Sequence, residues 1–580
     1  MTKKLALPLI ALVGLSVALQ AQEPLAQSNA SIYLWANKYV YSPDEALALR
    51  WSVKANGDAS TYSIFVFRQH NQTGQRLYYP GGREEVTDVF GNVQTGFRPT
   101  TVSEIEANKL VVLGENGIFG GAITVPEQFG MHTFVVQLRD PSGNRVVKSA
   151  YFKFGVVRSI LDVAENITSD RTWTSDRAYR LTGRVLIRDG ATLTIEPGTF
   201  VLGTPGSQPP SVLVVSTTGR LIAEGTRSRP IVMTSSQPFG ERRPGDWGGL
   251  IMLGQAPINV QGGTSAIEGL PESPETRYGG TRADHDCGRL RYVRVEYAGV
   301  ELVAANETNG ITTGGCGTRT VMDHLQVHLG LDDAFEFFGG NQDAKYLVAS
   351  YQIDDGIDID FGYSGRIQHA VVVLGAQGGN NGLEADGNLD QPNNSPFTNP
   401  TWYNVTMVGN YANAANQNEA VVGGLFLRRG VGGTYNNTIV YHWRGFGAAT
   451  STTAAQGFAS LQPRIEGGIL NADGLLVWEN GAADRPATME GQFQDLIRPW
   501  ISNNGRVKKV AYGNPLLRRA FDASNPDFRP LPNSAAFGPG WVAPPDDGFF
   551  DQWANYIGAF GDFDWTEEWT SFLQEEDIRP

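Results

Sequence analysis

Two stretches near the middle of the chain alternate apolar and polar residues with a period of two. They are residues 331–340 (LDDAFEFFGG) and 353–362 (IDDGIDIDFG), which share one pattern at an offset of 22 residues. Weaker copies follow at residues 380–387 and 422–428. Period-two alternation is typical of strands, and repetition at roughly 20 to 50 residues is typical of solenoids. The pattern therefore predicts a solenoid built from short strands.

Placing these copies in register assigns a direction to each side chain. The apolar residues of every strand must face the core, so the residues between them face outward. The first outward column contains Thr312, Glu336, Asp358, Glu384 and Phe426, and the second contains Gly314, Phe338, Asp360, Asp386 and Arg428. Because stacked strands lie about 4.8 Å apart, the five carboxylates of these columns should form an acidic ladder, with Arg428 on the next rung.

A second set of strands repeats with similar spacing. Its members are residues 292–296, 324–328, 346–350, 369–373, 404–408 and 436–440. In this register His324 and His369 occupy one column, and Tyr346 occupies the same column on the rung between them. A structural role for these histidines is favoured over a catalytic one.

The turns before the acidic strands carry further Asp and Asn residues. Asp332, Asp354 and Asn380 fall at one position of the repeat, and Asp333, Asp355 and Asn381 fall at the next. Asp and Asn side chains at turns commonly form hydrogen bonds with nearby backbone groups. We therefore expect hydrogen-bonded ladders that hold the bend.

The regions on either side of the repeats have different patterns. Residues 31–157 contain separate alternating segments divided by turn signals such as Asn56-Gly57, which predicts an immunoglobulin-like β-sandwich. Residues 546–580 hold nine aromatic residues. Because the open end of a solenoid exposes unpaired strands, we interpret residues 516–580 as a C-terminal aromatic cap. A sugar-binding aromatic platform is the alternative.

Composition narrows the class of protein. The chain has 69 glycines among 580 residues and few long amphipathic helical patterns, which favours many short strands joined by turns and an all-β fold. A formal net charge of −14 argues against nucleic acid and anionic membrane surfaces as partners, since both require basic patches.

Residues 1–21 have the pattern of a secretory signal peptide. Lys3 and Lys4 precede an apolar run of about a dozen residues, and the small residue Ala21 follows. The run is too short to span a bilayer, and no later segment has about 18 uninterrupted apolar residues. We therefore expect cleavage after Ala21 and export to the medium or the cell surface, without a transmembrane segment.

The chain contains two cysteines, Cys287 and Cys316. In an exported protein they are expected to form a disulfide. The bridge would close a loop of about 30 residues and stabilise the fold by roughly 3 kcal/mol in the chain-entropy description of disulfides.

Five motifs arrive in order along residues 160–520. They are TLTIEPGTFVLG, GRLIAEGTRSRPIVMTSS, DWGGLIMLGQAPIN, YVRVEYAG and DDAFEFFGG. Through these motifs the chain resembles the secreted bacterial right-handed parallel β-helix proteins of the pectate-lyase-like superfamily. The resemblance implies a right-handed parallel β-helix over residues 159–515. That superfamily contains polysaccharide lyases and hydrolases, but also adhesins and surface proteins without known chemistry.

The acidic ladder needs compensation, because like charges on neighbouring strands repel. Raised pKa values, a basic partner such as Arg428, or a bound hard cation could supply it. Calcium suits an extracellular group of carboxylates. Its expected ligands are Glu336, Asp358, Asp360, Glu384 and Asp386. A solvated acidic face is a second interpretation of the same residues.

Catalysis is the third interpretation, with Asp358, Asp360, Glu384, Asp386 and Arg428 as candidates. Carboxyl groups on neighbouring rungs would lie about 5 Å apart, which is near the separation in retaining glycosidases. A lyase would instead need calcium to acidify a uronate proton, and a base such as Arg428 or Arg429. The catalytic motifs of the pectate-lyase-like enzymes are not matched residue by residue.

The function that these observations favour is binding. The expected protein is secreted or on the cell surface, is stabilised by calcium, and binds a glycan or another extracellular component. One alternative is a polysaccharide lyase or glycoside hydrolase that uses the acidic ladder. The other is a purely structural surface or filament protein.

Overall fold

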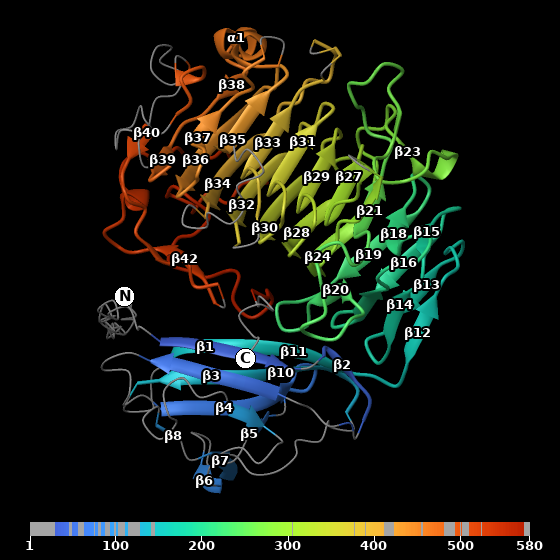
Figure 1. Cartoon of the computed structure of the whole chain (residues 1–580), viewed down its shortest axis with the longest axis vertical. Coiled ribbons are helices and arrows are strands. Elements are labelled where there is room, and N and C mark those ends of the chain that lie inside the picture. The colour runs from blue at the N-terminus through green and yellow to red at the C-terminus, as the bar shows by residue number, and fades with distance from the viewer. Residues whose placement is uncertain are drawn as a thin grey trace, which may run out of the picture.

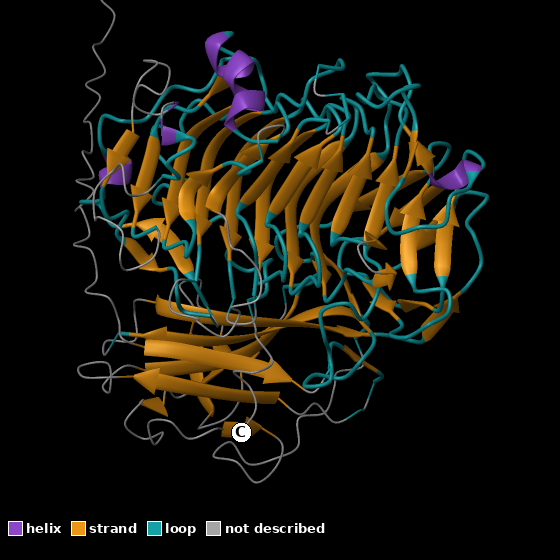
Figure 2. Cartoon of the chain, turned by 45° about the horizontal axis from the view of Figure 1, so that its top comes forward, coloured by secondary structure: helices purple, strands orange, loops and turns teal. Residues whose placement is uncertain are grey.

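The computed structural model describes most of the chain between residues 30 and 572. The described residues are 128–140, 146–303, 306–375, 378–388, 390–391, 393–410, 423–453, 456–480, 493–498, 500, 510–523 and 525–572, with separate segments between 30 and 113. The expected signal peptide, residues 1–21, lies outside them. Strands dominate the fold (Figure 2), and the helix α1 (Phe458–Glu466) has nine residues. Within the described part of the chain, no helix combines the length and the apolar composition needed to cross a membrane.

Parallel strands stacked along one axis form a β-helix (Figure 1). One of its sheets has nine strands, and neighbouring strands in it are parallel. In sheet order these strands are β15 (Arg184–Ile187), β18 (Val212–Val215), β21 (Leu250–Leu253), β27 (Ile311–Gly314), β29 (Phe335–Phe338), β31 (Ile357–Asp360), β33 (Leu383–Asp386), β35 (Gly423–Arg428) and β37 (Phe446–Ala449). The prediction of an all-β solenoid with parallel strands is confirmed.

The other large sheet has sixteen strands. Its main path is β12 (Ile160–Val163), β14 (Ala178–Leu181), β17 (Phe200–Gly203), β20 (Ile231–Ser235), β24 (Gly288–Glu296), β28 (Val321–His328), β30 (Asp343–Ser350), β32 (Arg366–Val373), β34 (Thr401–Val408), β36 (Gly433–Tyr441), β39 (Leu475–Trp478) and β40 (Val510–Tyr512). Off this path lie β13 (Arg171–Trp173), β16 (Thr192–Ile195), β19 (Arg220–Glu224) and β38 (Leu470–Asn471).

The long strands of this sheet bend in the middle. In β24, β28 and β32 the bend is at Tyr292, His324 and His369, whose φ angles are 48°, 56° and 57°. The residues before and after each bend pair separately with the next rung. The first half of β24 pairs with β19, and its second half pairs with β20. Each long strand therefore supplies two faces of the coil, and the nine-stranded sheet supplies another.

Small residues precede the strands of the nine-stranded sheet for a steric reason. A Cβ added at Gly356 would lie 2.3 Å from Cγ1 of Val372, and one added at Gly382 would lie 2.6 Å from Sδ of Met407. Both distances are well below van der Waals contact, so the coil has no space there for a larger side chain. Ala334, at the equivalent position of the neighbouring rung, is fully buried. Each repeat therefore has Gly or Ala at this position because the interior of the coil is too narrow there for a larger side chain.

A column of stacked rings runs along the bends. The ring centroids of Tyr292 and His324 lie 4.2 Å apart, those of His324 and Tyr346 lie 4.2 Å apart, and those of Tyr346 and His369 lie 4.9 Å apart. This arrangement confirms that His324 and His369 share a column separated by Tyr346. Aromatic stacking between rungs contributes to stability beyond simple burial, which agrees with a structural role.

The register predicted for the later rung was wrong by one residue. Val405 pairs with Thr438, so Asn437, and not Asn436, occupies the bend position after Asn404. The φ angles of Asn404 and Asn437 are 58° and 52°. The two adjacent asparagines have the same preferences, so the sequence did not distinguish them.

The N-terminal part of the chain forms two larger sheets beside the β-helix (Figure 1), and a separate antiparallel pair of β6 (Arg83–Thr87) and β7 (Val93–Phe97). One contains β1 (Ala30–Ala36), β3 (Leu49–Ala55) and β9 (Val111–Leu113). The other contains β2 (Val40–Tyr41), β4 (Ser63–His70), β5 (Arg76–Tyr78), β8 (Thr100–Thr101), β10 (Gly130–Arg139) and β11 (Val146–Val156). A two-sheet module agrees with a sandwich. Its likeness to immunoglobulin domains in particular remains a prediction.

This N-terminal module shares a hydrophobic core with the β-helix. Phe152 and Phe154 of β11 belong to the same buried cluster as Phe200 of β17 and Val232 of β20. The buried ammonium group of Lys153 donates a hydrogen bond of 2.9 Å to the carbonyl of Ser228. The module is therefore packed against the coil.

The described residues of the C-terminal segment lie along a side of the β-helix, and the aromatic cap predicted for its open end is not confirmed. The side-chain amide of Asn437 donates a hydrogen bond of 2.7 Å to the carbonyl of Val542, and the backbone N–H of Ser571 donates one of 2.8 Å to Gln326. The segment thus runs back over several rungs toward the N-terminal module. Its buried Trp565 and Trp569 share a cluster with apolar residues of the long strands, including Val348. That side of the sheet is apolar and needs cover, which explains the placement.

Candidate functional site

The nine-stranded sheet places the acidic residues of the ladder in two columns. Glu336 on β29 pairs with Asp358 on β31, and Asp358 pairs with Glu384 on β33. Asp386 pairs with Arg428 on β35. The inward residues Phe335, Ile357, Leu383 and Leu425 are fully buried. The observed register is therefore the one that the alternation predicts.

Two arginines neutralise the end of the ladder that lies on β33. Arg428 forms an ion pair with Glu384, and its Nε lies 2.6 Å from Asp386; Nη1 of Arg429 lies 2.6 Å from the other carboxylate oxygen of Asp386. Burial lowers the pKa of Arg428 to about 10, so its guanidinium stays charged at neutral pH. Burial and then Asp358 raise the pKa of Asp386, and Arg429 lowers it. The net pKa lies well above the ordinary value of an aspartate, and the guanidinium at each oxygen opposes this shift by stabilising the ionised form.

Three carboxylates at the other end of the ladder converge. Oxygen atoms of Asp333, Glu336 and Asp358 lie within 4.8 Å of one another. Asn309 donates a hydrogen bond to Glu336. Among the described residues, no Lys or Arg forms an ion pair with any of these three carboxylates. Asp333 and Glu336 are buried, being 7% and 6% exposed.

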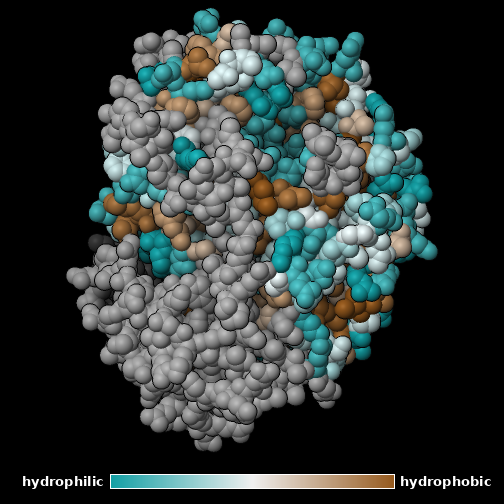
Figure 3. Space-filling view, viewed as in Figure 1, coloured by the Kyte–Doolittle hydropathy of each residue, from teal (hydrophilic) through white to brown (hydrophobic). Residues whose placement is uncertain are grey.

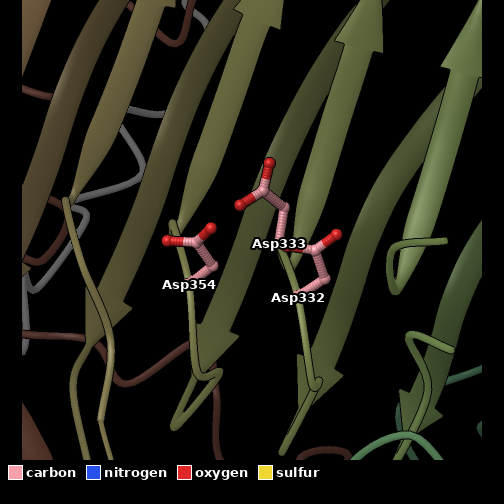
Figure 4. Close-up of side chains that lie close together, drawn as sticks. All are labelled: Asp332, Asp333 and Asp354. Carbon is pink, nitrogen blue, oxygen red and sulfur yellow. The ribbon is translucent and has the colours of Figure 1, made fainter. Parts of the chain in front are cut away.

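A second group of carboxylates shares Asp333. Oxygen atoms of Asp332, Asp333 and Asp354 also lie within 4.8 Å of one another. In Figure 4, Asp332 and Asp333 are next to each other before one strand, and Asp354 lies on the neighbouring turn. We call the two groups together the acid cluster, which consists of Asp332, Asp333, Glu336, Asp354 and Asp358.

Burial raises the pKa values of four members of the acid cluster, Asp332, Asp333, Glu336 and Asp358. It raises the pKa of Asp358 to about 7, against the opposite effect of Arg428. Burial and then Asp354 raise the pKa of Asp332 to about 8. The pKa of Asp333 is raised well above its ordinary value by burial and then Asp332, and that of Glu336 by burial and then Asp358. Because no described Lys or Arg forms an ion pair with Asp333, Glu336 or Asp358, these three carboxyl groups need either protons or a bound cation to neutralise them.

A chain of hydrogen bonds crosses the turns beside the cluster. Oδ1 of Asn309 accepts a hydrogen bond of 3.2 Å from the N–H of Asp333, and Oδ1 of Asp333 accepts one of 2.8 Å from the N–H of Asp355. Asp355 accepts in turn from the N–H of Asn381. This confirms the predicted ladder at Asp333, Asp355 and Asn381. Asp333 thus both holds the turn and belongs to the acid cluster.

A long insertion between β21 and β24 covers part of the same face. Its residues Ile258, Ile267 and Tyr278 share a buried cluster with Phe338 of β29. The predicted disulfide, Cys287–Cys316, is present with an S–S distance of 2.04 Å and connects the end of this insertion to the residues after β27. The insertion also supplies Glu268, whose charge raises the pKa of Glu336 and of Asp360.

Four members of the acidic environment were not predicted as part of it, namely Asp332, Asp333, Asp354 and Glu268. Asp333 was assigned to the turn alone, because alternation along a strand does not describe the bend that places it beside Glu336. The spacing of Asp333 and Glu336, three residues apart in DDAFE, was the available signal. Glu268 lies in a non-repeating insertion, which offers no register to align.

The acidic face of the nine-stranded sheet does not line the cavity found in the structure. In Figure 3, hydrophilic residues gather in the upper part of the view, near where Figure 1 shows β31 and β33. A cavity of about 200 Å³ lies instead between the N-terminal module and the C-terminal segment, and its lining includes Lys148, Arg529 and Glu567. Its lining includes neither the ladder nor the acid cluster.

Comparison with known proteins places the chain in a family. The family described as the pectate-lyase like beta helix domain matches residues 165–468, which is just over half of the chain. No curated protein matches it. The matched residues contain the whole acidic ladder, the acid cluster and the disulfide. The chain therefore belongs to the pectate-lyase-like β-helix family.

Proposed function

We propose that this protein is an exported, calcium-stabilised β-helix protein that binds polysaccharide without cleaving it. The observation that carries the proposal is the division of the acidic ladder. Glu384 and Asp386 are paired with Arg428 and Arg429, whereas Asp333, Glu336 and Asp358 converge with no such ion pair among the described residues. The polysaccharide partner is inferred from the family to which the chain belongs.

Calcium is the cation that suits this arrangement. It takes carboxylate and carbonyl oxygens in a loose geometry, and its extracellular sites have dissociation constants of about 10⁻⁴ to 10⁻³ M. The acid cluster offers only oxygen donors, and they come from two neighbouring rungs. A bound Ca²⁺ would therefore link the two rungs. Asp333, Glu336 and Asp358 are its proposed ligands, with Asp332 and Asp354 beside them. Asp360, Glu384 and Asp386, which the sequence also suggested, are not in either converging group of described residues.

The burial of the ladder favours binding over catalysis. Glu336 and Asp386 are 6% and 2% exposed, and Glu384 is engaged by Arg428. A general acid or base must reach the proton that it transfers. Side chains that are enclosed or held in ion pairs stabilise the coil instead, which leaves its outer surfaces for the polymer.

Export is supported by two independent features. The expected signal peptide at residues 1–21 would direct the chain out of the cytoplasm. The disulfide Cys287–Cys316 is compatible with an oxidising compartment. Calcium at millimolar concentration is also available outside the cell, where a site of the proposed affinity would be occupied.

The proposal predicts retention of the protein by at least one polysaccharide when calcium is present. Affinity electrophoresis through gels that contain cellulosic, xylan or polyuronate polymers measures this retention, with a gel that lacks polymer as the control. Chelation should weaken retention, because loss of the cation loosens the rungs. Equal mobility in every polymer gel, in calcium, would leave the purely structural surface or filament protein as the better interpretation.

A lyase or hydrolase is the second candidate function, and one observation favours it. Asp358 is only partly buried, and its pKa of about 7 suits a general acid near neutral pH. Under the binding proposal, assays for unsaturated and reducing ends should detect no product from neutral or uronate polysaccharides. Product release that falls by more than about 100-fold in Asp358→Asn, but not in Asp162→Asn on the first rung, would establish catalysis at the ladder.

A further inference from the structure

The C-terminal segment leaves one tryptophan on the surface. Trp565 and Trp569 of this segment are 5% and 0% exposed, whereas Trp553 is 57% exposed. Among the described residues, no other tryptophan is exposed to this degree. The side chain is not needed to fill the core that its neighbours occupy. Its exposure therefore calls for an explanation other than packing.

Trp553 is held in a fixed orientation. Its indole stacks on the imidazole of His369, with centroids 5.4 Å apart and an angle of 14° between the planes. His369 is fully buried and continues the column of rings formed with Tyr346. Trp553 is thus the outermost ring of a rigid stack, so little rotamer entropy would be lost when a ligand binds it.

The backbone beside Trp553 is fixed as well. Asp551 accepts hydrogen bonds of 2.9 Å from Lys345 and 2.7 Å from the hydroxyl of Tyr346. Its backbone N–H donates a hydrogen bond of 2.7 Å to Gln368. Three contacts from two adjacent rungs of the β-helix therefore anchor the segment immediately before the tryptophan.

The surroundings of Trp553 are polar but close to electrical balance. Gln552 and Asn555, both exposed, lie within two residues of it in the chain. The amide nitrogen of Gln552 donates hydrogen bonds to the carbonyls of Pro545 and Phe550, which hold that side chain in place. Lys345 is paired with Asp551, and the guanidinium of Arg366 lies 2.8 Å from Asp547. A rigid aromatic face with neighbouring amides fits the apolar C–H face and the hydroxyl groups of a sugar ring. Because the cations are already paired and the chain carries a net charge of −14, a polyuronate is disfavoured.

The geometry points to Trp553 as a stacking platform for a neutral polysaccharide, with Gln552 and Asn555 as its hydrogen-bonding neighbours. This inference rests on the proposed function and names the ligand class and the surface that would bind it. The surface lies on the C-terminal segment, on a different side of the coil from the acid cluster. Binding here does not require any residue of the acidic ladder.

Affinity electrophoresis of variants tests the platform. With hydroxyethyl cellulose and soluble xylan as probes, Trp553→Ala should weaken retention at least tenfold, and Trp553→Phe should keep part of it because a ring remains. Phe563→Ala is the matched control, since Phe563 is an exposed aromatic residue (59%) of the same segment and should leave retention unchanged. A gel that contains polygalacturonate should retain the wild type no more strongly than it retains Trp553→Ala.

Each outcome either supports or overturns the inference. Thermal unfolding checks that Trp553→Ala folds, and because the side chain is 57% exposed and stacks on His369 from one side, we expect only a small drop in the midpoint. Retention by neutral polymers that is equal in wild type and Trp553→Ala overturns the platform but leaves the proposed function standing. No retention of the wild type by any polymer overturns both. Self-association of the wild type that is lost in Trp553→Ala, measured by sedimentation, would instead assign the surface to a second copy of the chain.

Discussion

Arg428→Ala is expected to lower the free energy of unfolding by about 3 kcal/mol, in line with the loss of one partner from a buried ion pair. The substitution removes the partner of Glu384 and one of the two guanidinium contacts of Asp386. The side chains of these acids are 12% and 4% exposed, so water cannot replace the lost partner. Urea denaturation followed by circular dichroism measures the change.

An exposed ion pair of the same β-helix provides the control for Arg428. Arg180 pairs with Asp162 at 2.7 Å, but the two side chains are 41% and 55% exposed. Arg180→Ala should therefore cost less than about 1 kcal/mol. Adding Glu384→Gln and Asp386→Asn to Arg428→Ala should recover part of the loss, because neutral side chains need no counter-charge. Equal costs for Arg428→Ala and Arg180→Ala would show that the pairing contributes little.

Removal of calcium is expected to destabilise the protein, and the effect should grow as pH rises from about 5 to about 8, because Asp358 and Asp332, with pKa values of about 7 and about 8, lose protons over this range. At about 100 times its dissociation constant, a ligand that binds only the folded state contributes about 2.7 kcal/mol. Thermal or urea unfolding in calcium and in EDTA, repeated across this pH range, measures the difference. A midpoint that is identical in calcium and EDTA at pH 8 would eliminate the cation.

The sign of this pH dependence follows from the raised pKa values. In the unfolded chain an Asp titrates near about 3.9, whereas in the fold the pKa is about 7 for Asp358 and about 8 for Asp332. Below the unfolded pKa, the folded chain without a cation gains the full stabilisation from the bound protons. That stabilisation, on the order of 4 kcal/mol for Asp358 alone, is lost as pH rises through the folded pKa values. Calcium replaces the protons, so its contribution appears as theirs disappears.

A matched pair of variants isolates the acid cluster from other titrating groups. Asp358→Asn removes one carboxylate from the cluster and should reduce both the calcium effect and its dependence on pH. Asp162→Asn, at an exposed position, should leave both unchanged. Calcium binding by the wild type should also release protons near pH 7, which calorimetry in buffers of different ionisation enthalpy detects.

The acidic ladder could be predicted in detail because it depends on a single period. Once Ile357 and Leu383 face the core, the residue after each of them must face outward, and parallel pairing brings Asp358 beside Glu384. The disulfide followed from the number of cysteines and the expected compartment.

The partners of the ladder could not be predicted to the same extent. Arg428 was visible one rung away, but its pairing with both Glu384 and Asp386 depends on side-chain conformation. Asp333 lies beside Glu336 because the chain bends between them. The conformation of this bend does not follow from the alternation along the strand. Glu268 lies in an insertion that does not follow the repeat. The C-terminal segment covers a side of the coil because the apolar surface that it buries lies there.

The sequence by itself therefore determined the β-helix, the direction of each strand residue, the two acidic columns and the disulfide, because these follow from local alternation repeated along the chain. The tertiary structure decided which carboxylates are neutralised by arginine and which converge in the acid cluster. It also decided that Trp553 stands exposed while Trp565 and Trp569 are buried. These outcomes depend on contacts between segments far apart in the chain, and no local pattern encodes such contacts.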